Sequence, residues 1–118
     1  MLSGDAGRER PEVLVRRSAR AARPDVLHAL AAGLEEEGVP FRVEEARGGA
    51  AYELAHAAAL ASRLRVGIGV DADGRVCVHH AQLPLSAPVA AGPPESARLL
   101  GHNAARLVTG IPLKPEPA

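Results

Sequence analysis

The sequence lacks tryptophan and contains only one cysteine, one tyrosine and one phenylalanine. With Cys77 alone, no disulfide can form within the chain, which is typical of a protein in a reducing cytoplasm. The core must therefore be built from Leu, Val, Ile and many Ala side chains, each of which buries little apolar area. This composition is consistent with a domain that a partner stabilises. A GC-rich genome, which favours Ala, Arg, Gly and Pro codons, explains it equally well.

The 118-residue chain has no excess of charge of either sign, because 14 Lys and Arg residues balance 14 Asp and Glu residues. A nucleic-acid-binding module would carry a basic excess or a basic stripe, so this class is disfavoured. No apolar run approaches the roughly 20 residues that cross a bilayer, and residues 1–11 contain no apolar stretch typical of signal peptides. We therefore expect one cytoplasmic domain over residues 12–114, with a disordered lead-in at 1–11 and a frayed tail at 115–118.

Hydrophobic periodicity and turn residues divide the domain into short elements. Strands are predicted at 12–16, 41–44, 65–70 and 75–79, and helices at 24–37, 51–64 and 95–109. Gly38 is expected to end the first helix in a left-handed conformation, and Gly67 and Gly69 indicate that another backbone approaches the third strand closely. Residues 82–94, with four of the ten prolines, are expected to form an extended connection. The order β-α-β-α-β-β-α predicts an α/β fold, a single three-layer domain with a mixed, mostly parallel sheet covered by helices.

Two segments resemble ligand-binding loops but depart from them. The glycines between 67 and 74 are wrongly spaced for a dinucleotide loop, and a hairpin follows where the phosphate-binding helix should begin. Asp71 and Asp73 resemble the start of a calcium loop, but positions 75–77 do not supply its later ligands. A solvated hairpin turn is the simpler interpretation of both patterns.

Cys77, His79 and His80, on or beside the fourth predicted strand, are further candidates for chemistry. Adjacent strand residues point to opposite faces, so the two histidines cannot easily bind one metal ion together. We expect one of them to be buried and hydrogen-bonded and the other to lie at a surface or interface. Cys77 and His79 share a face, and a Cys–His nucleophilic pair is conceivable, but no oxyanion-hole loop is evident nearby. No catalytic and no cofactor-binding residue is therefore predicted.

The densest charged feature is the acidic triplet, Glu35, Glu36 and Glu37, at the end of the first predicted helix. Anions at a helix C-terminus oppose the helix dipole, at a cost of some tenths of a kcal/mol each. This cost favours an external cation, either a basic partner or a divalent ion such as Mg²⁺ that takes one carboxylate from this chain; a solvated helix end is the alternative. Asn103 and Arg106 are neighbours on the last helix, either as a polar flank or as groups that recognise a partner's backbone or carboxylate.

Four segments resemble, in their residues and in their order along the chain, the small subunits of diol/glycerol dehydratase-reactivating factors. These segments are residues 34–41, 65–70, 79–84 and 101–114. The signatures Glu-Glu-Glu-Gly-Val-Pro-Phe and Asn-Ala-Ala-Arg-Leu-Val-x-Gly-Ile-Pro carry the resemblance, which covers roughly residues 12–114. The last helix is also similar to the medium subunit of the dehydratases themselves. That subunit is longer, has extra N-terminal sequence and lacks the early Glu-rich motif in this setting, whereas the Arg-rich stretch 16–23 matches no motif of either group.

The resemblance implies a fold similar to that of the dehydratase medium subunit and a function in a chaperone-like complex. Adenosylcobalamin-dependent diol and glycerol dehydratases trap a damaged cobalamin, and the reactivating factor releases it. In this family the large subunit is an ATPase that binds ATP or ADP, and the small subunit is non-catalytic. The two form a heterodimer or a dimer of heterodimers, and the small subunit exchanges with the dehydratase medium subunit. The resemblance also implies a cytoplasmic protein, associated with a bacterial microcompartment.

Residue by residue, the resemblance assigns Glu36 as a ligand, in trans, to a Mg²⁺ held largely by the large subunit. Glu35, Glu37, Asn103 and Arg106 are assigned with it to the partner interface. By the same resemblance the chain alone binds no cofactor, and its balanced charge and short apolar runs predict that neither nucleic acid nor a membrane is its partner.

Two other functions remain open at this point. The chain could be a cobalamin-contacting medium subunit of a dehydratase, in which case bound corrinoid would absorb visible light after purification. It could also be a small stand-alone enzyme that uses Cys77 and His79, in which case alkylation of the thiol would abolish its activity.

Overall fold

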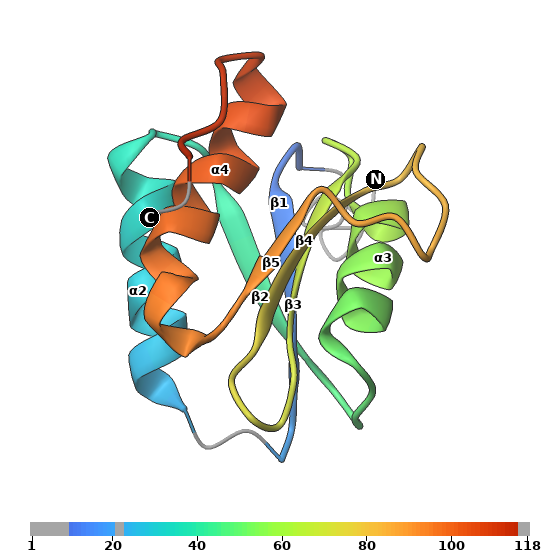
Figure 1. Cartoon of the computed structure of the whole chain (residues 1–118). Helices are drawn as coiled ribbons and strands as arrows, with labels where there is room; N and C mark the ends of the chain where they lie inside the picture. The colour runs from blue at the N-terminus through green and yellow to red at the C-terminus, as the bar shows by residue number, and fades with distance from the viewer. Residues whose placement is uncertain (1–9, 21–22, 116–118) are drawn as a thin grey trace.

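The computed structural model of the chain describes residues 10–20 and 23–115, so most of the predicted lead-in and tail lies outside the described residues. At its centre is a five-stranded sheet with the strand order β2-β1-β3-β4-β5 (Figure 1). β1 pairs in parallel with β2 and β3, and β4 pairs antiparallel with β3 and β5. The strands are β1 (Val13–Ser18), β2 (Phe41–Ala46), β3 (Val66–Val70), β4 (Val76–His80) and β5 (Ala90–Gly92).

β5 corrects the sequence prediction, which treated residues 82–94 as a connection without a strand. Ala90–Gly92 pairs with Val76–Val78 of β4. Alanine and glycine have low strand propensity, so the local sequence gives no strand signal, and the pairing depends on the edge that β4 offers. With β5 included, the sheet has two parallel and two antiparallel pairings, and its parallel part is confined to β2, β1 and β3.

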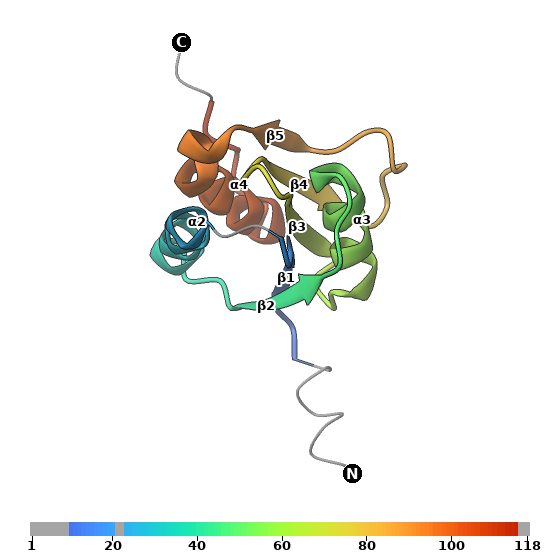
Figure 2. The same ribbon diagram turned by 90° about the horizontal axis from the view of Figure 1, so that it is seen from below.

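Helices cover both faces of this sheet. α2 (Pro24–Glu36) and α4 (Ala97–Thr109) lie side by side on one face, and α3 (Ala51–Ala61) lies on the other, as Figure 2 shows. A short 3₁₀ turn, η1 (Pro94–Ser96), leads into α4. The predicted three-layer α/β architecture with a mixed sheet is thereby confirmed.

The helix ends follow from local chemistry. α2 begins at Pro24 and is followed by Gly38, whose φ of 74° confirms the predicted left-handed terminator. α3 ends at Ala61, three residues before the predicted end, because the backbone of Ser62 is extended. The Ser62 hydroxyl donates a 2.6 Å hydrogen bond to the carbonyl of Glu12, which ties the end of α3 to the start of β1.

α3 packs on the sheet through very small side chains. Its buried residues are Leu54, Ala55, Ala58 and Ala59. Beneath them, β3 presents Gly67 and Gly69, where an added Cβ atom would lie closer than 3.0 Å to backbone atoms of α3. The close backbone approach that the sequence indicated at these glycines is therefore present.

The opposite face of the sheet buries the larger aliphatic side chains. Fully buried members of this core include Leu30, Leu34, Ile68 and Leu100. These residues come from α2, β3 and α4, so both helices are anchored to the sheet by one continuous apolar layer. Within residues 10–20 and 23–115, no helix is long and apolar enough to cross a membrane.

α2 and α4 also touch each other backbone to backbone. A Cβ atom added to Gly33 of α2 would collide with the carbonyl oxygen of Arg98, and one added to Gly101 of α4 would lie 2.5 Å from the carbonyl oxygen of Leu30. The two helices can approach this closely only because neither glycine has a side chain. The contact fixes the C-terminal half of α2 against the middle of α4.

Candidate functional site

The acidic triplet lies where the end of α2 meets α4. Glu35 and Glu36 occupy the last turn of α2, and Glu37 is its C-terminal capping residue. α4 faces them with three basic side chains spaced four residues apart, which places all three on one side of the helix. These are Arg98, His102 and Arg106.

Glu36 is bound through both of its carboxylate oxygens. The Nε atom of Arg98 donates a 3.0 Å hydrogen bond to Oε1, and a terminal nitrogen of the same guanidinium donates to Oε2. The Nε2 atom of His102 lies 2.8 Å from Oε1. The hydrogen bonds from Arg98, and to a smaller extent those from His102, hold the pKa of the Glu36 carboxyl below its ordinary value.

Glu37 is held more deeply in the same cluster. Its Oε2 atom lies 2.6 Å from Nδ1 of His102 and accepts a 3.1 Å hydrogen bond from Nε of Arg106. The hydrogen bonds from His102, followed by those from Arg106, lower the pKa of the Glu37 carboxyl. His102 thus bridges Glu36 and Glu37, and both of its ring nitrogens can donate at once only when the imidazole is protonated.

These contacts change the electrostatic argument made from the sequence. The sequence of α2 alone contains no charge that compensates the acidic triplet, which favoured an external cation. The structure shows that Arg98 and Arg106 of the same chain supply cations to two of the three carboxylates, and that His102 lies within hydrogen-bond distance of both. The helix dipole by itself therefore does not require an external ion. The signal was present in the sequence as the i, i+4, i+8 spacing of the three basic residues, and it was missed because only Asn103 and Arg106 were considered.

Glu35 differs from its two neighbours. Its side chain is exposed and borders a shallow hollow that is also lined by Gly38 and Phe41. Among the residues that the structure describes, no basic side chain forms an ion pair with it. Glu35 therefore remains accessible to whatever packs against this end of α2.

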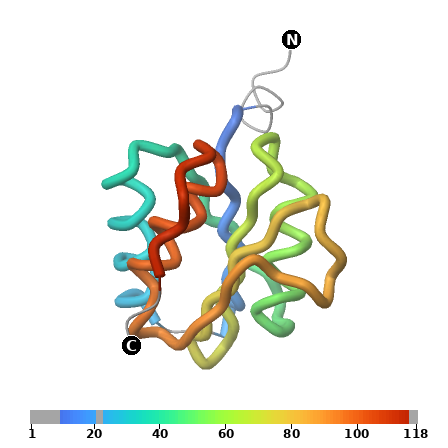
Figure 3. The backbone as a smooth tube through the Cα atoms, turned by 45° about the horizontal axis from the view of Figure 1, so that its top comes forward, coloured from blue at the N-terminus to red at the C-terminus, as the bar shows by residue number. Residues whose placement is uncertain are grey.

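Asn103 and Arg106 both bind the segment that follows α4. Gly110, with a φ of 75°, turns the chain, and residues 111–115 run back beside α4 (Figure 3). The Asn103 amide donates to the carbonyl of Lys114 at 3.0 Å and accepts from its N–H at 2.7 Å. Arg106 donates to the carbonyl of Pro112 at 3.2 Å.

This arrangement changes how Asn103 can act at an interface. Its side chain is only 4% exposed, and its oxygen and nitrogen are both bonded within the chain. Any contribution of Asn103 to partner binding must therefore pass through the position of the tail. The tail itself presents Ile111 and Leu113, which are 47% and 39% exposed.

No self-contained metal site is present in the part of the chain that the structure describes, because no three His, Cys, Asp or Glu side chains are grouped suitably. In the hairpin turn, one carboxylate oxygen of Asp71 accepts hydrogen bonds from the N–H groups of Asp73 and Arg75, each at 2.9 Å. The Asp71 side chain thus stabilises the turn, as the simpler interpretation of this segment expects.

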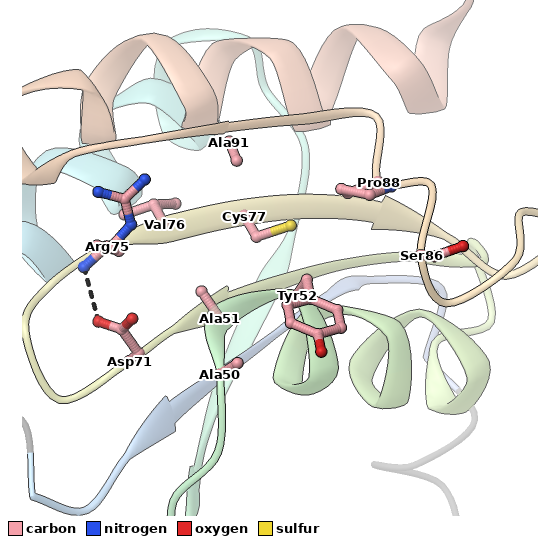
Figure 4. A pocket seen from close by; sticks show the side chains of 10 residues that line it. All are labelled: Ala50, Ala51, Tyr52, Asp71, Arg75, Val76, Cys77, Ser86, Pro88 and Ala91. Atoms are coloured by element: carbon pink, nitrogen blue, oxygen red, sulfur yellow. Dashed lines mark hydrogen bonds between the residues drawn. The ribbon is translucent and has the colours of Figure 1, made fainter.

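Cys77 lines a pocket of about 440 Å³ between the start of α3 and the strands β4 and β5. Figure 4 shows the thiol between Tyr52 of α3 and Pro88 of the loop that precedes β5. Burial raises the pKa of the Cys77 thiol to about 11, which disfavours the thiolate that a nucleophile requires.

His79 does not serve as a base for Cys77. Its Nδ1 atom accepts a hydrogen bond from the N–H of His80 at 3.0 Å, and its Nε2 atom donates to the carbonyl of Leu85 at 3.1 Å. The ring packs edge-on against His56 of α3. His79 is thus the buried, hydrogen-bonded histidine and His80 the partly exposed one, as the sequence predicted. The Cys–His pair of the stand-alone-enzyme hypothesis is not assembled.

Comparison with known families places nearly all of the chain in one group. Residues 10–114 match the model of the dehydratase medium subunit family. The chain is 39% identical over 100 residues to the propanediol dehydratase-reactivating factor small subunit of Citrobacter freundii. This match covers 81% of this chain and 85% of that protein. It is 43% identical over 86 residues to the diol dehydratase-reactivating factor small subunit of Klebsiella michiganensis, covering 70% and 68% of the two chains.

Two solved structures share this fold. A chain described as glycerol dehydratase reactivase is 40% identical, with a TM-score of 0.86, and the match covers 90% of this chain and 98% of that one. A chain from a structure of diol dehydratase-reactivating factor complexed with ADP and Mg²⁺ is 33% identical, with a TM-score of 0.80, and the match covers 91% and 100%. The similarity therefore extends over the sheet and the three helices.

Proposed function

The chain belongs to the dehydratase medium subunit family and, within it, to the small subunits of dehydratase-reactivating factors, and on this basis we propose that it is the non-catalytic small subunit of such a factor. Its client is an adenosylcobalamin-dependent diol or glycerol dehydratase that has trapped a damaged cobalamin. The observation that carries the proposal is the agreement of sequence and fold with reactivating-factor chains over about nine-tenths of this chain. The same relatives favour this function over that of a cobalamin-contacting dehydratase subunit.

We further propose that the chain works by exchange with the dehydratase medium subunit. A large ATPase subunit binds this chain, releases it, and docks onto the medium subunit in its place, which loosens the dehydratase so that the damaged cofactor escapes. Two observations support this sequence of events. The chain matches the medium-subunit family over residues 10–114, so it has the shape needed to occupy an equivalent surface. A reactivating factor with a similar chain has been solved with ADP and Mg²⁺.

The donor chemistry of the acidic triplet fits a shared Mg²⁺ at this interface. Mg²⁺ is held in proteins by one or two carboxylates together with other oxygen ligands. Glu36 offers a carboxylate that is 39% exposed at the end of α2, and the described residues contain no second set of ligands that could complete a site without a partner. Glu36 would hold the ion from this side, and the ion would supply a positive charge that bridges the two subunits.

The other predicted interface residues take different roles around Glu36. Glu35 is exposed and can meet a basic group of the large subunit directly. Glu37 and Arg106 keep the end of α2 fixed against α4. Asn103 holds the tail, so that Ile111 and Leu113 form a defined apolar surface beside the charged cluster.

The exchange can be followed by gel filtration. We expect the chain to co-elute with the large ATPase subunit in the presence of Mg²⁺ and ADP. After addition of inactivated dehydratase and ATP, the chain should elute alone, while the large subunit migrates with the dehydratase and enzyme activity returns. Failure of the chain to bind the large subunit, or turnover of a substrate by the purified chain alone, would overturn the proposal.

A further inference from the structure

The three carboxylates of the acidic triplet differ in how firmly they are held. The side chain of Glu37 is 15% exposed, and its partners His102 and Arg106 are 13% and 25% exposed. Glu36 is 39% exposed, and its partner Arg98 is 62% exposed, the highest value in the cluster. Arg98 can therefore swing into solvent without disturbing other contacts, whereas His102 and Arg106 are enclosed. Glu36 is also held at Oε1 by His102, so of its two partners only Arg98 can leave, and Oε2, which Arg98 alone bonds, then becomes free.

Arg98 engages both carboxylate oxygens of Glu36. Its guanidinium bonds both carboxylate oxygens of Glu36 in a fork-shaped arrangement. A cation cannot coordinate either oxygen on that side while the guanidinium is in place, and two positive charges at such short range repel each other. Arg98 is thus a competitor of any cation that approaches Glu36.

The backbone contact between α2 and α4 holds Arg98 close to Glu36. A Cβ atom on Gly33 would meet the carbonyl oxygen of Arg98 and the amide nitrogen of His102. The backbones that carry Arg98 and Glu36 are therefore held close together, and the more exposed of the two side chains is that of Arg98. Displacement of the guanidinium needs a change of rotamer and no rearrangement of the fold.

We propose that Arg98 is a displaceable latch on Glu36, which holds the carboxylate in the free chain and must leave it before Glu36 can bind the shared Mg²⁺. The inference rests on the proposed function, because it concerns the association of this chain with the large subunit. Arg98 is a positioning residue that sets the magnesium concentration at which the two subunits associate. The latch also keeps Glu36 from binding other cations while the chain is free between rounds of exchange.

The latch predicts a gain of association when Arg98 is removed. Exposed ion pairs contribute little to stability, so loss of this one should lower the magnesium concentration for half-maximal association by about two- to fivefold. Arg98→Gln removes the charge and the fork. Arg98→Lys keeps the charge but cannot bond both oxygens in the same way, so its shift should be smaller.

The experiment is a magnesium titration of the full chain with the purified large subunit, followed by sedimentation velocity. Arg63→Gln, which removes an exposed arginine just after α3 on the other side of the sheet, is the matched control and should leave the midpoint unchanged. Thermal unfolding of each variant establishes that it folds, and Arg98→Lys provides a second, conservative test.

Three results would overturn the inference, and they are distinguishable. If Arg98→Gln raises the midpoint, Arg98 is itself a contact with the large subunit. If Arg98→Gln leaves the midpoint unchanged while Glu36→Gln raises it, Glu36 is a ligand but Arg98 does not compete for it. If the wild-type chain does not associate at any magnesium concentration, the proposed function fails, and the latch fails with it.

Discussion

The two faces of the sheet are built in opposite ways. The α3 face brings alanines onto glycines and leaves almost no space between the backbones. The α2–α4 face combines a layer of large aliphatic side chains with a cluster of five charged or titratable groups at one end. The first face tolerates no added volume at its two glycines, and the second carries the residues that we propose to lie at a partner interface. Both faces therefore contribute to stability, and the charged residues that we propose to act in recognition lie on only one of them.

The largest expected effect comes from adding volume to the α3 face. Gly67→Ala places a methyl group against the backbone of α3, which must move, so we expect a loss of about 3 kcal/mol in the free energy of unfolding. Urea denaturation measures this loss. Gly48→Ala is the control, because a Cβ atom there meets nothing within 4 Å and should change stability by no more than about 0.5 kcal/mol. Equal stabilities for the two variants would contradict the close packing.

The same change on the other face should affect both stability and association. Gly101→Ala pushes α4 away from the carbonyl of Leu30, at a cost of about 2 kcal/mol, which is partly offset by the better helix propensity of alanine. Because α4 carries His102 and Arg106, which hold Glu37 at the end of α2, the shift should also displace the proposed interface and weaken binding to the large subunit. Folded Gly67→Ala, measured at the same temperature, should bind the large subunit with the affinity of the wild-type chain. Equal binding by both variants would show that the position of α4 does not matter.

A smaller effect is expected where the tail meets α4. Asn103→Ala removes the two hydrogen bonds to Lys114 and should lower stability by about 1 kcal/mol. Asn103→Asp retains the acceptor for the Lys114 N–H but turns the donor into a second acceptor, so it should not restore the tail. Amide hydrogen exchange at Lys114 should be faster in both variants. Unchanged protection at this amide would rule out the role assigned to Asn103.

The smallest effect is a dependence of stability on pH. The pKa of the Glu37 carboxyl is lower in the folded chain than its ordinary value of 4.5, so its pairing stabilises the fold fully above that pH and the stabilisation is lost as the pH falls through the lowered folded pKa. Glu37→Gln should therefore be less stable than wild type near neutral pH, and the difference should shrink on acidification to about pH 3. Urea denaturation at several pH values tests this. A difference that grows towards low pH would contradict the pairing.

How far the sequence predicts each face depends on the range of the interactions. Gly67 and Gly69 predicted that another backbone packs closely on β3, because glycine in a buried strand has few other uses. Gly38 predicted the end of α2. β5 was missed because its pairing with β4 is set by the tertiary structure and not by its own residues. The partners of Glu36 lie more than 60 residues away on α4. Local sequence patterns could not predict these ion pairs, because they depend on how the two helices pack. Asn103 was predicted to be a polar flank or a partner contact, and its contact with the tail could not be foreseen because it depends on the turn at Gly110.

The central claim is that Glu36 serves association with a large subunit and contributes little to the stability of the chain. The test compares Glu36→Ala with the wild-type chain. It measures the dissociation constant for the large subunit in Mg²⁺ and the melting temperature of the free chain. We predict a loss of affinity of about tenfold or more and a fall in melting temperature of less than about 4 °C, with Glu95→Gln as the control for loss of an exposed carboxylate. Equal affinity of Glu36→Ala and wild type would contradict the account.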